Sequence, residues 1–310
     1  MKHTFLASAA VAFSLTFAAQ PALADDHEEK DPAAEARTFS GDDIFDLTVG
    51  TDPQISPDGR QIAYVRRAND IMTDGVKSTI WLIDVASGTE TPLVAGEGSH
   101  SSPRWSDDGS KLAYISTASG GGPELHVRWM RSGASANITA LPEGPSGVTW
   151  SPDGTQLAFT ARVPGKGLVL GAPPAKPEGA EWGKPLQVID KVTYRRDGGS
   201  YVKPGTVQLF VVSAKGGAPR QLTFGEYSNG GAVEWSPDGS KLYYSANRSE
   251  DWELEPLRAQ IYSLDVTSGA ITQITDRVGP DFGAQVSPDG RQIAYLGFDD
   301  VGNAFDQTNL

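Results

Sequence analysis

The sequence contains no cysteine among its 310 residues and only four histidines. Without cysteine the chain can form no disulfide, no thiolate nucleophile and no zinc–thiolate site. Two of the histidines precede residue 39, which leaves His100 and His126 for the rest of the chain. We expect a loop histidine at 100 and a strand histidine at 126, and neither lies in a plausible nucleophile context.

Long hydrophobic runs are scarce as well. One apolar run, from Phe5 to Ala19, follows Lys2 and is followed by the small-residue pattern Ala22-Leu23-Ala24. The run is shorter than the roughly 20 residues of a membrane-spanning helix, and its flanks are typical of a secretory signal peptide. The sequence therefore predicts a signal peptide over 1–24, export to the periplasm or the medium, and no membrane span after cleavage.

Positive charge is in deficit, because 26 Lys and Arg residues face 39 Asp and Glu residues and the net charge is −13. Such a chain repels a phosphate backbone, so we expect no nucleic-acid partner. Six of the acids lie in 25–38, which contains no large apolar side chain and is expected to be an acidic flexible leader.

One short pattern is repeated five times after residue 39. It combines a Ser-Pro-Asp-Gly turn with an alternating apolar run, and it reads "ISPDGRQIAYV" from 55, "WSDDGSKLAYI" from 105, "WSPDGTQLAFT" from 150, "WSPDGSKLYYS" from 235 and "VSPDGRQIAYL" from 286. Most intervals between these turns are near 50 residues, a period typical of propeller blades. Three turns are preceded by tryptophans that we expect to pack between blades, namely Trp105, Trp150 and Trp235.

The turn residues have a structural explanation. Proline presets φ, glycine accepts a positive φ, and the Ser and Asp side chains can bond to the backbone. The recurring acids could instead be considered as calcium ligands, but only one acid per turn recurs and the spacing lacks a calcium loop. We therefore interpret these five acids as turn caps: Asp58, Asp108, Asp153, Asp238 and Asp289.

The run after each turn is apolar on both faces, as in Ile62-Ala63-Tyr64-Val65, so both faces of this strand must be buried. A second hairpin unit with its own turn glycine lies between successive turns, as in "WLIDVASGTETPLV" from 81. Two hairpins per period make four strands. The predicted fold is all-β: a β-propeller of four-stranded antiparallel blades, an incomplete arc of about five blades over 39–310.

The third interval is 35 to 40 residues longer than the others, and we interpret the excess as an insertion on one blade at about 163–206. Arg195, Arg196 and Tyr201 in this insertion are candidate contacts for a substrate carboxylate or another domain. The acidic stretch "SEDWELEP" offers Glu253 and Glu255 as candidate contacts for a peptide amino terminus. A plain surface loop is the alternative for both segments.

These repeats behind a signal peptide, together with the insertion "QVIDKVTYRRDGGSYVKPGTVQLFVV", resemble the N-terminal propeller of the prolyl oligopeptidase family of serine peptidases. The resemblance is to the bacterial dipeptidyl-peptidase and acylaminoacyl-peptidase types. It implies a propeller that caps a following α/β-hydrolase domain and restricts the entry of peptide substrates. It implies no metal and no cofactor.

The catalytic part of that family has no counterpart in the sequence. The nearest string to the required G-x-S-x-G elbow, from Gly133 to Asn137, lacks the last glycine and lies in an expected hairpin. No catalytic residue is assigned, and the chain is expected to be inactive alone. Its last residues, "YLGFDDVGNAFDQTNL", stop where the earlier repeats begin a second hairpin. We expect a fragment or prematurely ended product whose exposed blade faces promote self-association.

Three functions follow as hypotheses. The first is the substrate-gating propeller of an exported serine peptidase. The alternative is a periplasmic interaction propeller resembling the Tol-Pal translocation protein. A third, a lyase or lactonase propeller with a metal in its channel, is disfavoured because only two histidines lie in the repeats.

Overall fold

The computed structural model describes residues 38–168, 170–171, 174–183, 188–197, 201–302 and 306–310. The chain divides into Met1–Gly41 and a compact unit from Asp42 to Leu310. The predicted signal peptide (1–24) and almost all of the predicted leader lie outside the described residues. No helix among the described residues is long and apolar enough to cross a membrane.

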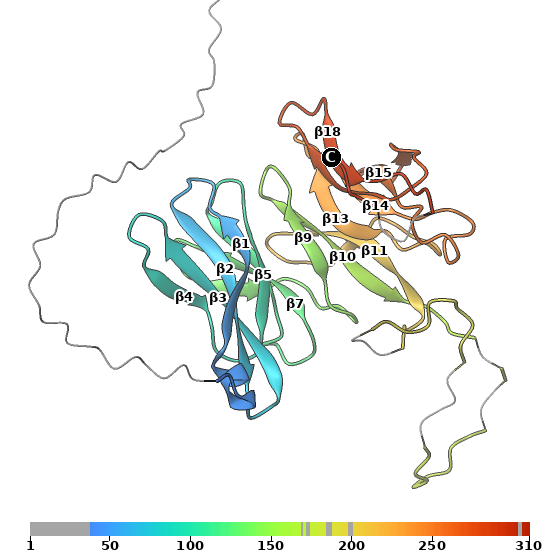
Figure 1. Ribbon diagram of the computed structural model, residues 1–310, viewed down its shortest axis with the longest axis horizontal. Coiled ribbons are helices and arrows are strands. Elements are labelled where there is room, and N and C mark those ends of the chain that lie inside the picture. The colour runs from blue at the N-terminus through green and yellow to red at the C-terminus, as the bar shows by residue number, and fades with distance from the viewer. Residues whose placement is uncertain (1–37, 169, 172–173, 184–187, 198–200, 303–305) are drawn as a thin grey trace, which may run out of the picture. The chain divides into compact units, whose positions relative to one another are not determined.

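The compact unit is almost entirely β-structure, arranged as successive antiparallel sheets (Figure 1). A short 3-10 helix, η1 (Gly41–Asp46), precedes the first of four four-stranded sheets, and a two-stranded sheet ends the series. The strands of the first two sheets, blades 1 and 2, are β1 (Thr48–Ile55), β2 (Gln61–Asp70), β3 (Gly75–Asp84) and β4 (Glu90–Val94), then β5 (His100–Trp105), β6 (Lys111–Ser116), β7 (Glu124–Trp129) and β8 (Ser135–Asn137).

Blades 3 and 4 follow with the same order, and blade 5 has two strands. Their strands are β9 (Ser146–Trp150), β10 (Gln156–Pro164), β11 (Gly205–Ser213) and β12 (Arg220–Gln221), then β13 (Gly230–Trp235), β14 (Lys241–Ala246), β15 (Gln260–Asp265) and β16 (Ile271–Gln273), and finally β17 (Asp281–Val286) and β18 (Ile293–Gly297). The first strands of consecutive blades contact one another, as the inner strands of a propeller do. The predicted propeller of four-stranded blades is confirmed.

Each Ser-Pro-Asp-Gly turn joins the first and second strands of its blade in the same way. In the third turn, Ser151 Oγ donates to Asp153 Oδ1 at 2.6 Å, and the amide of Thr155 donates to the same oxygen at 3.0 Å. Its glycine, Gly154, has φ +63°. In all five turns the pKa of the acid is lowered, and the largest cause is the hydrogen bond from the turn serine. The pKa falls to about 2 at Asp108 and Asp238. These acids therefore act as turn caps.

The two faces of each second strand pack against different neighbours. Ala63 of blade 1 points toward blade 2, where it joins a core cluster with Leu112 and Tyr114. Ala158 of blade 3 packs in the same way against Tyr244 of blade 4. Blades 1, 2 and 3 thus present an alanine to the next blade, and blades 2, 3 and 4 present an aromatic ring to the preceding one; Tyr243 takes the alanine position in blade 4.

In blades 2 and 3 both apolar faces of the second strand are covered, as expected. In blade 1 the face of Ile62 and Tyr64 is not covered by a blade within the described residues, so the expectation that both faces of Ile62–Val65 are buried is wrong there.

A second repeated hydrogen-bond pattern occurs in blades 2, 3 and 4. A Glu or Gln in the third strand accepts a hydrogen bond from the hydroxyl of the Thr that lies 15 residues later. The same hydroxyl accepts a hydrogen bond from the backbone amide of the residue that follows the Glu or Gln. The pairs are Glu124 with Thr139, Gln208 with Thr223 and Gln260 with Thr275. All six residues are buried. Blade 1 has Thr79 and Val94 at the same spacing, so this pattern is not part of every repeat.

The insertion interrupts blade 3 between its second and third strands. Those strands stay paired as far as Pro164 and Gly205, so the connecting segment covers 165–204, slightly less than predicted. Its described parts extend from the ends of β10 and β11 away from the sheets (Figure 1).

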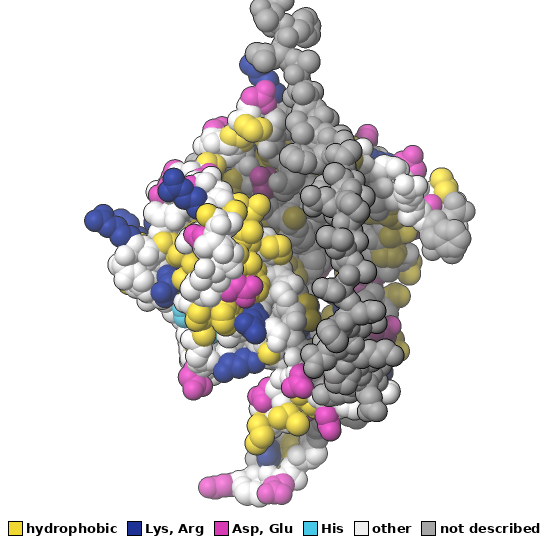
Figure 2. Space-filling view, turned by 60° about the vertical axis from the view of Figure 1, so that its left-hand side comes forward, with side chains coloured by type: hydrophobic (Ala, Val, Ile, Leu, Met, Phe, Trp, Pro, Cys, Tyr) yellow, Lys and Arg dark blue, Asp and Glu magenta, His cyan; other side chains and the backbone are white. Residues whose placement is uncertain are grey.

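The face of blade 1 that points away from blade 2 is not covered by another blade within the described residues. A hollow of about 460 Å³ on this face is lined by Ile62, Tyr64 and Ile83, with Arg66 and Glu90 beside them. Figure 2, which brings the β4 side of Figure 1 forward, shows apolar side chains gathered among charged ones. At the other end of the series, Asn309 pairs with Gly297 of β18 through two backbone hydrogen bonds.

Candidate functional site

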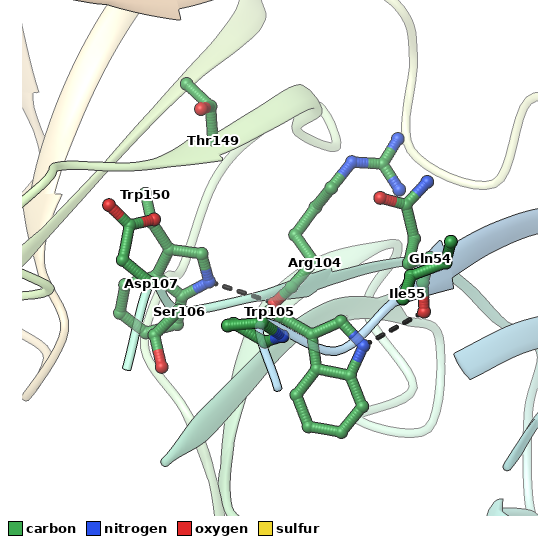
Figure 3. A pocket seen from close by; sticks show the side chains of 9 residues that line it. Gln54, Ile55, Arg104, Trp105, Ser106, Asp107, Thr149 and Trp150 are labelled. Carbon is green, nitrogen blue, oxygen red and sulfur yellow. Dashed lines mark hydrogen bonds between the residues drawn. The ribbon is translucent and has the colours of Figure 1, made fainter. Parts of the chain in front are cut away.

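A pocket of about 220 Å³ lies where the first strands of blades 1, 2 and 3 approach their turns (Figure 3). Two tryptophans shape it by bonding across the blades. Trp105 Nε1 donates to the carbonyl of Gln54 at 3.1 Å, and Trp150 Nε1 donates to the carbonyl of Arg104 at 2.9 Å. Each indole therefore connects its own blade to the preceding one, which confirms the expected packing between blades.

The third tryptophan departs from this pattern. Trp235 is as buried as Trp150, but its Nε1 is buried without a hydrogen-bond partner in the described part of the chain. Blades 1 and 5 carry Ile55 and Val286 at the same position before the turn. Within the described residues, the tryptophan hydrogen bonds between blades are thus those of Trp105 and Trp150, which connect blades 1, 2 and 3 where the pocket lies. We call these two bonds the indole ladder.

Opposite charges line the pocket. Arg104 Nη1 lies 2.9 and 3.0 Å from the two carboxylate oxygens of Asp52, a residue held at φ +50°. Asp107 replaces the proline found in the other four turns. Burial, followed by the neighbouring Asp108, raises the pKa of Asp107. Glu234 does not line the pocket, and burial, followed by Asp107, raises its pKa. In its ionised form the Asp107 carboxylate attracts a cationic ligand group.

The pocket has no arrangement for nucleophilic catalysis. Ser106 Oγ donates to Asp108 at 2.7 Å and accepts from the amide of Lys111 at 3.0 Å, so this hydroxyl caps the turn. Neither His100 nor His126 lines the pocket.

The insertion residues predicted as contacts lie in a small hairpin. Arg195 and Tyr201 form an antiparallel bridge, and the rings of Tyr194 and Tyr201 lie 6.3 Å apart. Arg196 follows in the same exposed stretch, and residues 198–200 lie outside the described residues. Among the ion pairs of the described residues, none joins Arg195 or Arg196 to an acid. The structure places these residues together and leaves their predicted role untested.

The acidic loop between β14 and β15 contacts the insertion through a residue that sequence reasoning missed. Lys191 Nζ lies 3.0 Å from Glu253 Oε1 and 5.8 Å from the centre of the Trp252 ring. The bond to Glu253 is the largest cause that raises the pKa of Lys191. Glu255 pairs with Arg258 of its own loop at 3.6 Å instead. Within the described parts of the insertion, Glu253 is thus the one of the two candidates that forms an ion pair with it.

The topology explains why these segments meet. Strands two and three of each blade are joined at the end opposite to the Ser-Pro-Asp-Gly turn, since neighbouring strands are antiparallel. The insertion and the β14–β15 loop are this connection in blades 3 and 4. Both carry exposed apolar side chains, including Val192, Tyr194 and Leu254. We call the described parts of 165–204 and 247–259 the loop face.

Of the two histidines of the repeats, His100 is buried and His126 is half-buried. His126 lies in β7, as expected, but His100 begins β5 and is 3% exposed, so the predicted loop position is wrong. The strand begins at this histidine, which pairs with Ser116 of β6 and whose Nδ1 lies 2.9 Å from Ser116 Oγ.

Two family models match the chain. The TolB beta propeller domain matches residues 47–171, and the dipeptidyl peptidase IV N-terminal region matches residues 190–301. An uncharacterized peptidase, YuxL, of Bacillus subtilis is 33% identical over 214 residues, which are 69% of this chain and 32% of the relative. Dipeptidyl-peptidase 5 of Porphyromonas endodontalis is 23% identical over 282 residues, 83% of this chain and 38% of the relative.

A solved structure shares the fold. The acylaminoacyl peptidase of Pyrococcus horikoshii superposes with a TM-score of 0.59 at 15% identity, over 82% of this chain and 36% of that chain. The chain spans about a third of the length of the curated relatives that it matches.

Trp150→Phe tests the indole ladder, with Trp235→Phe as its matched control. Both substitutions shorten a buried indole, but only the first removes a hydrogen bond and leaves the Arg104 carbonyl without its donor. We expect Trp150→Phe to lower the free energy of unfolding by about 1 kcal/mol more than Trp235→Phe. Urea unfolding measures both; equal losses would contradict the structural role of the bond.

Lys191→Met tests the contact between the insertion and the β14–β15 loop. The ion pair is partly exposed, so its loss is expected to cost about 0.2–1 kcal/mol. Limited proteolysis should cleave the insertion up to a few times faster than in the unchanged protein. Lys203→Met is the control, because Lys203 lies 3.5 Å from Glu143 and contacts no part of the β14–β15 loop. Identical cleavage rates for Lys191→Met and the unchanged protein would refute the contact.

Proposed function

We propose that this chain, a β-propeller similar in sequence to the dipeptidyl peptidase IV N-terminal region and to the peptidase YuxL, restricts and orients peptide substrates for a peptidase catalytic domain. The observation that carries this proposal is the loop face. Two connections from neighbouring blades meet there through Lys191 and Glu253, at the end of the sheets away from the structural turns.

The chemistry of the loop face suits a peptide or a protein surface. Exposed apolar side chains that gather with charged ones are a common mark of interaction sites. Arg195 and Arg196 supply positive charge for a carboxylate, and Glu253 and Glu255 supply negative charge for an amino group. In this proposal these residues and Tyr201 contact the substrate or the catalytic domain, and the chain is exported by the signal peptide proposed for 1–24.

The pocket of Figure 3 favours a second candidate function, an interaction propeller of the TolB type. It lies within the segment that matches the TolB beta propeller domain, and its indole ladder and the Asp107 carboxyl group provide a preformed site. In that case the partner binds at the turn end of the first three blades, and no peptidase activity accompanies the protein.

A peptidase assay distinguishes the two functions. The chain from residue 25 to 310 is incubated with alanyl and acylaminoacyl chromogenic substrates and with a serine-directed fluorophosphonate, beside the product that cells make from the natural gene. We expect the natural gene product alone to cleave the substrates and to be labelled.

Each other outcome is decisive. Cleavage or labelling of the 25–310 product would overturn the conclusion that the propeller carries no catalytic residues. If neither product reacts, the gating proposal fails and the TolB-type interaction function takes its place.

A further inference from the structure

A buried histidine, His100, and a half-buried one, His126, lie in the interface between blades 1 and 2, on either side of Tyr114. The Tyr114 ring stacks on the His126 ring with centroids 5.3 Å apart, and the His100 ring meets its edge at 6.2 Å. Tyr114 itself packs against Ala63 and Ile80 of blade 1. The imidazoles are therefore part of the surface that holds the two blades together.

Neither imidazole has an acceptor for a second proton. His100 Nδ1 bonds Ser116 Oγ at 2.9 Å, but Nε2 of both histidines is buried with no hydrogen-bond partner in the described chain. A protonated imidazole has two N–H donors. Charging His100 would thus leave an unpaired N–H and a buried charge in the interface, and charging His126 would leave an unpaired N–H at its buried Nε2.

The charged groups around the rings do not compensate for such a charge. Burial, then His126, then Lys77 on β3 of blade 1 lower the pKa of His100. Burial lowers the pKa of His126, although Glu124 on its own strand opposes the shift. Both Glu124 oxygens already accept hydrogen bonds, from Thr139 and Leu141. Arg128, further along β7 on the same face, adds positive charge.

We propose that the interface between blades 1 and 2 is an acid-sensitive joint, which opens as His100 and His126 are protonated while the other blade interfaces stay closed. The folded-state pKa values lie below the ordinary value of about 6.5. The stabilisation is therefore complete above that pH and is lost as the pH falls below it. Each histidine can raise the open population at pH 5 by up to about 30-fold.

The other blades show that the histidines are not required by the fold. The third-strand partner of the aromatic residue is His126 in blade 2, Phe210 in blade 3 and Tyr262 in blade 4. The residue that corresponds to His100 in blade 4 is Asn229. His100→Asn together with His126→Phe therefore removes both titrating groups with side chains that this propeller already uses at the same places.

The absence of cysteine allows a direct test. Ala63→Cys places one thiol in the blade 1–2 interface, and Ala158→Cys places one in the blade 3–4 interface, where no histidine lies. Both alanines are fully buried. The labelling rate of each variant is measured from pH 7.5 to 5.0 with 4,4′-dithiodipyridine, which reacts with thiols in acid. The ratio of the two rates removes the intrinsic pH dependence of the reagent.

We expect the labelling rate of the Ala63→Cys variant, divided by that of the Ala158→Cys variant, to rise several-fold between pH 7.5 and 5.0. In the His100→Asn/His126→Phe background this ratio should stay constant. A constant ratio with the histidines present would overturn the proposal, and so would an equal rise without them.

Thermal unfolding without any introduced thiol gives a second measure. On acidification, the melting temperature of the His100→Asn/His126→Phe variant should fall less than that of the unchanged protein. An equal loss in the two proteins contradicts the joint.

Discussion

Burial of the second strand between two neighbouring blades is the constraint on which the rest of the structure depends, and in blades 2 and 3 it covers both faces of that strand. A lone four-stranded sheet would expose both apolar rows, so the blades must stack. The stacking is directional, because alanine on one blade meets an aromatic ring on the next. Ala63 meets Tyr114, and Ala158 meets Tyr244. Ser-Pro-Asp-Gly turns and indole bonds then fix the ends of the inner strands.

This constraint separates the structural end of the blades from the variable end. The turn end is repeated with nearly identical hydrogen bonds, and its acids cap turns. The opposite end carries connections of very different length, from short links to the insertion between β10 and β11. Changes there leave the packed faces untouched, which is why the loop face is the natural place for function to differ between members of such a family.

The fold could be predicted from the sequence because its signals are local and repeated. The turn serine, acid and glycine lie within four residues, and strands such as Leu112–Ile115 carry apolar side chains on both faces, all of them buried. The contacts of the candidate site are not local. Lys191 and Glu253 are far apart in the sequence and share no motif, and Arg104 meets Asp52 of another blade. The Glu/Gln–Thr spacing of 15 residues was a detectable signal, whereas the strand position of His100 depends on Ser116 across the sheet.

The central claim is that the loop face, and not the turn end, contacts the substrate or the catalytic domain. A photoreactive amino acid at Tyr194 on the loop face, compared with one at Thr155 on the turn end, tests it directly in cells that express the natural gene product. The account predicts cross-links from position 194 to a peptide or to a peptidase catalytic domain, and none from position 155. Cross-links from position 155 alone would contradict it and place the interaction at the turn end.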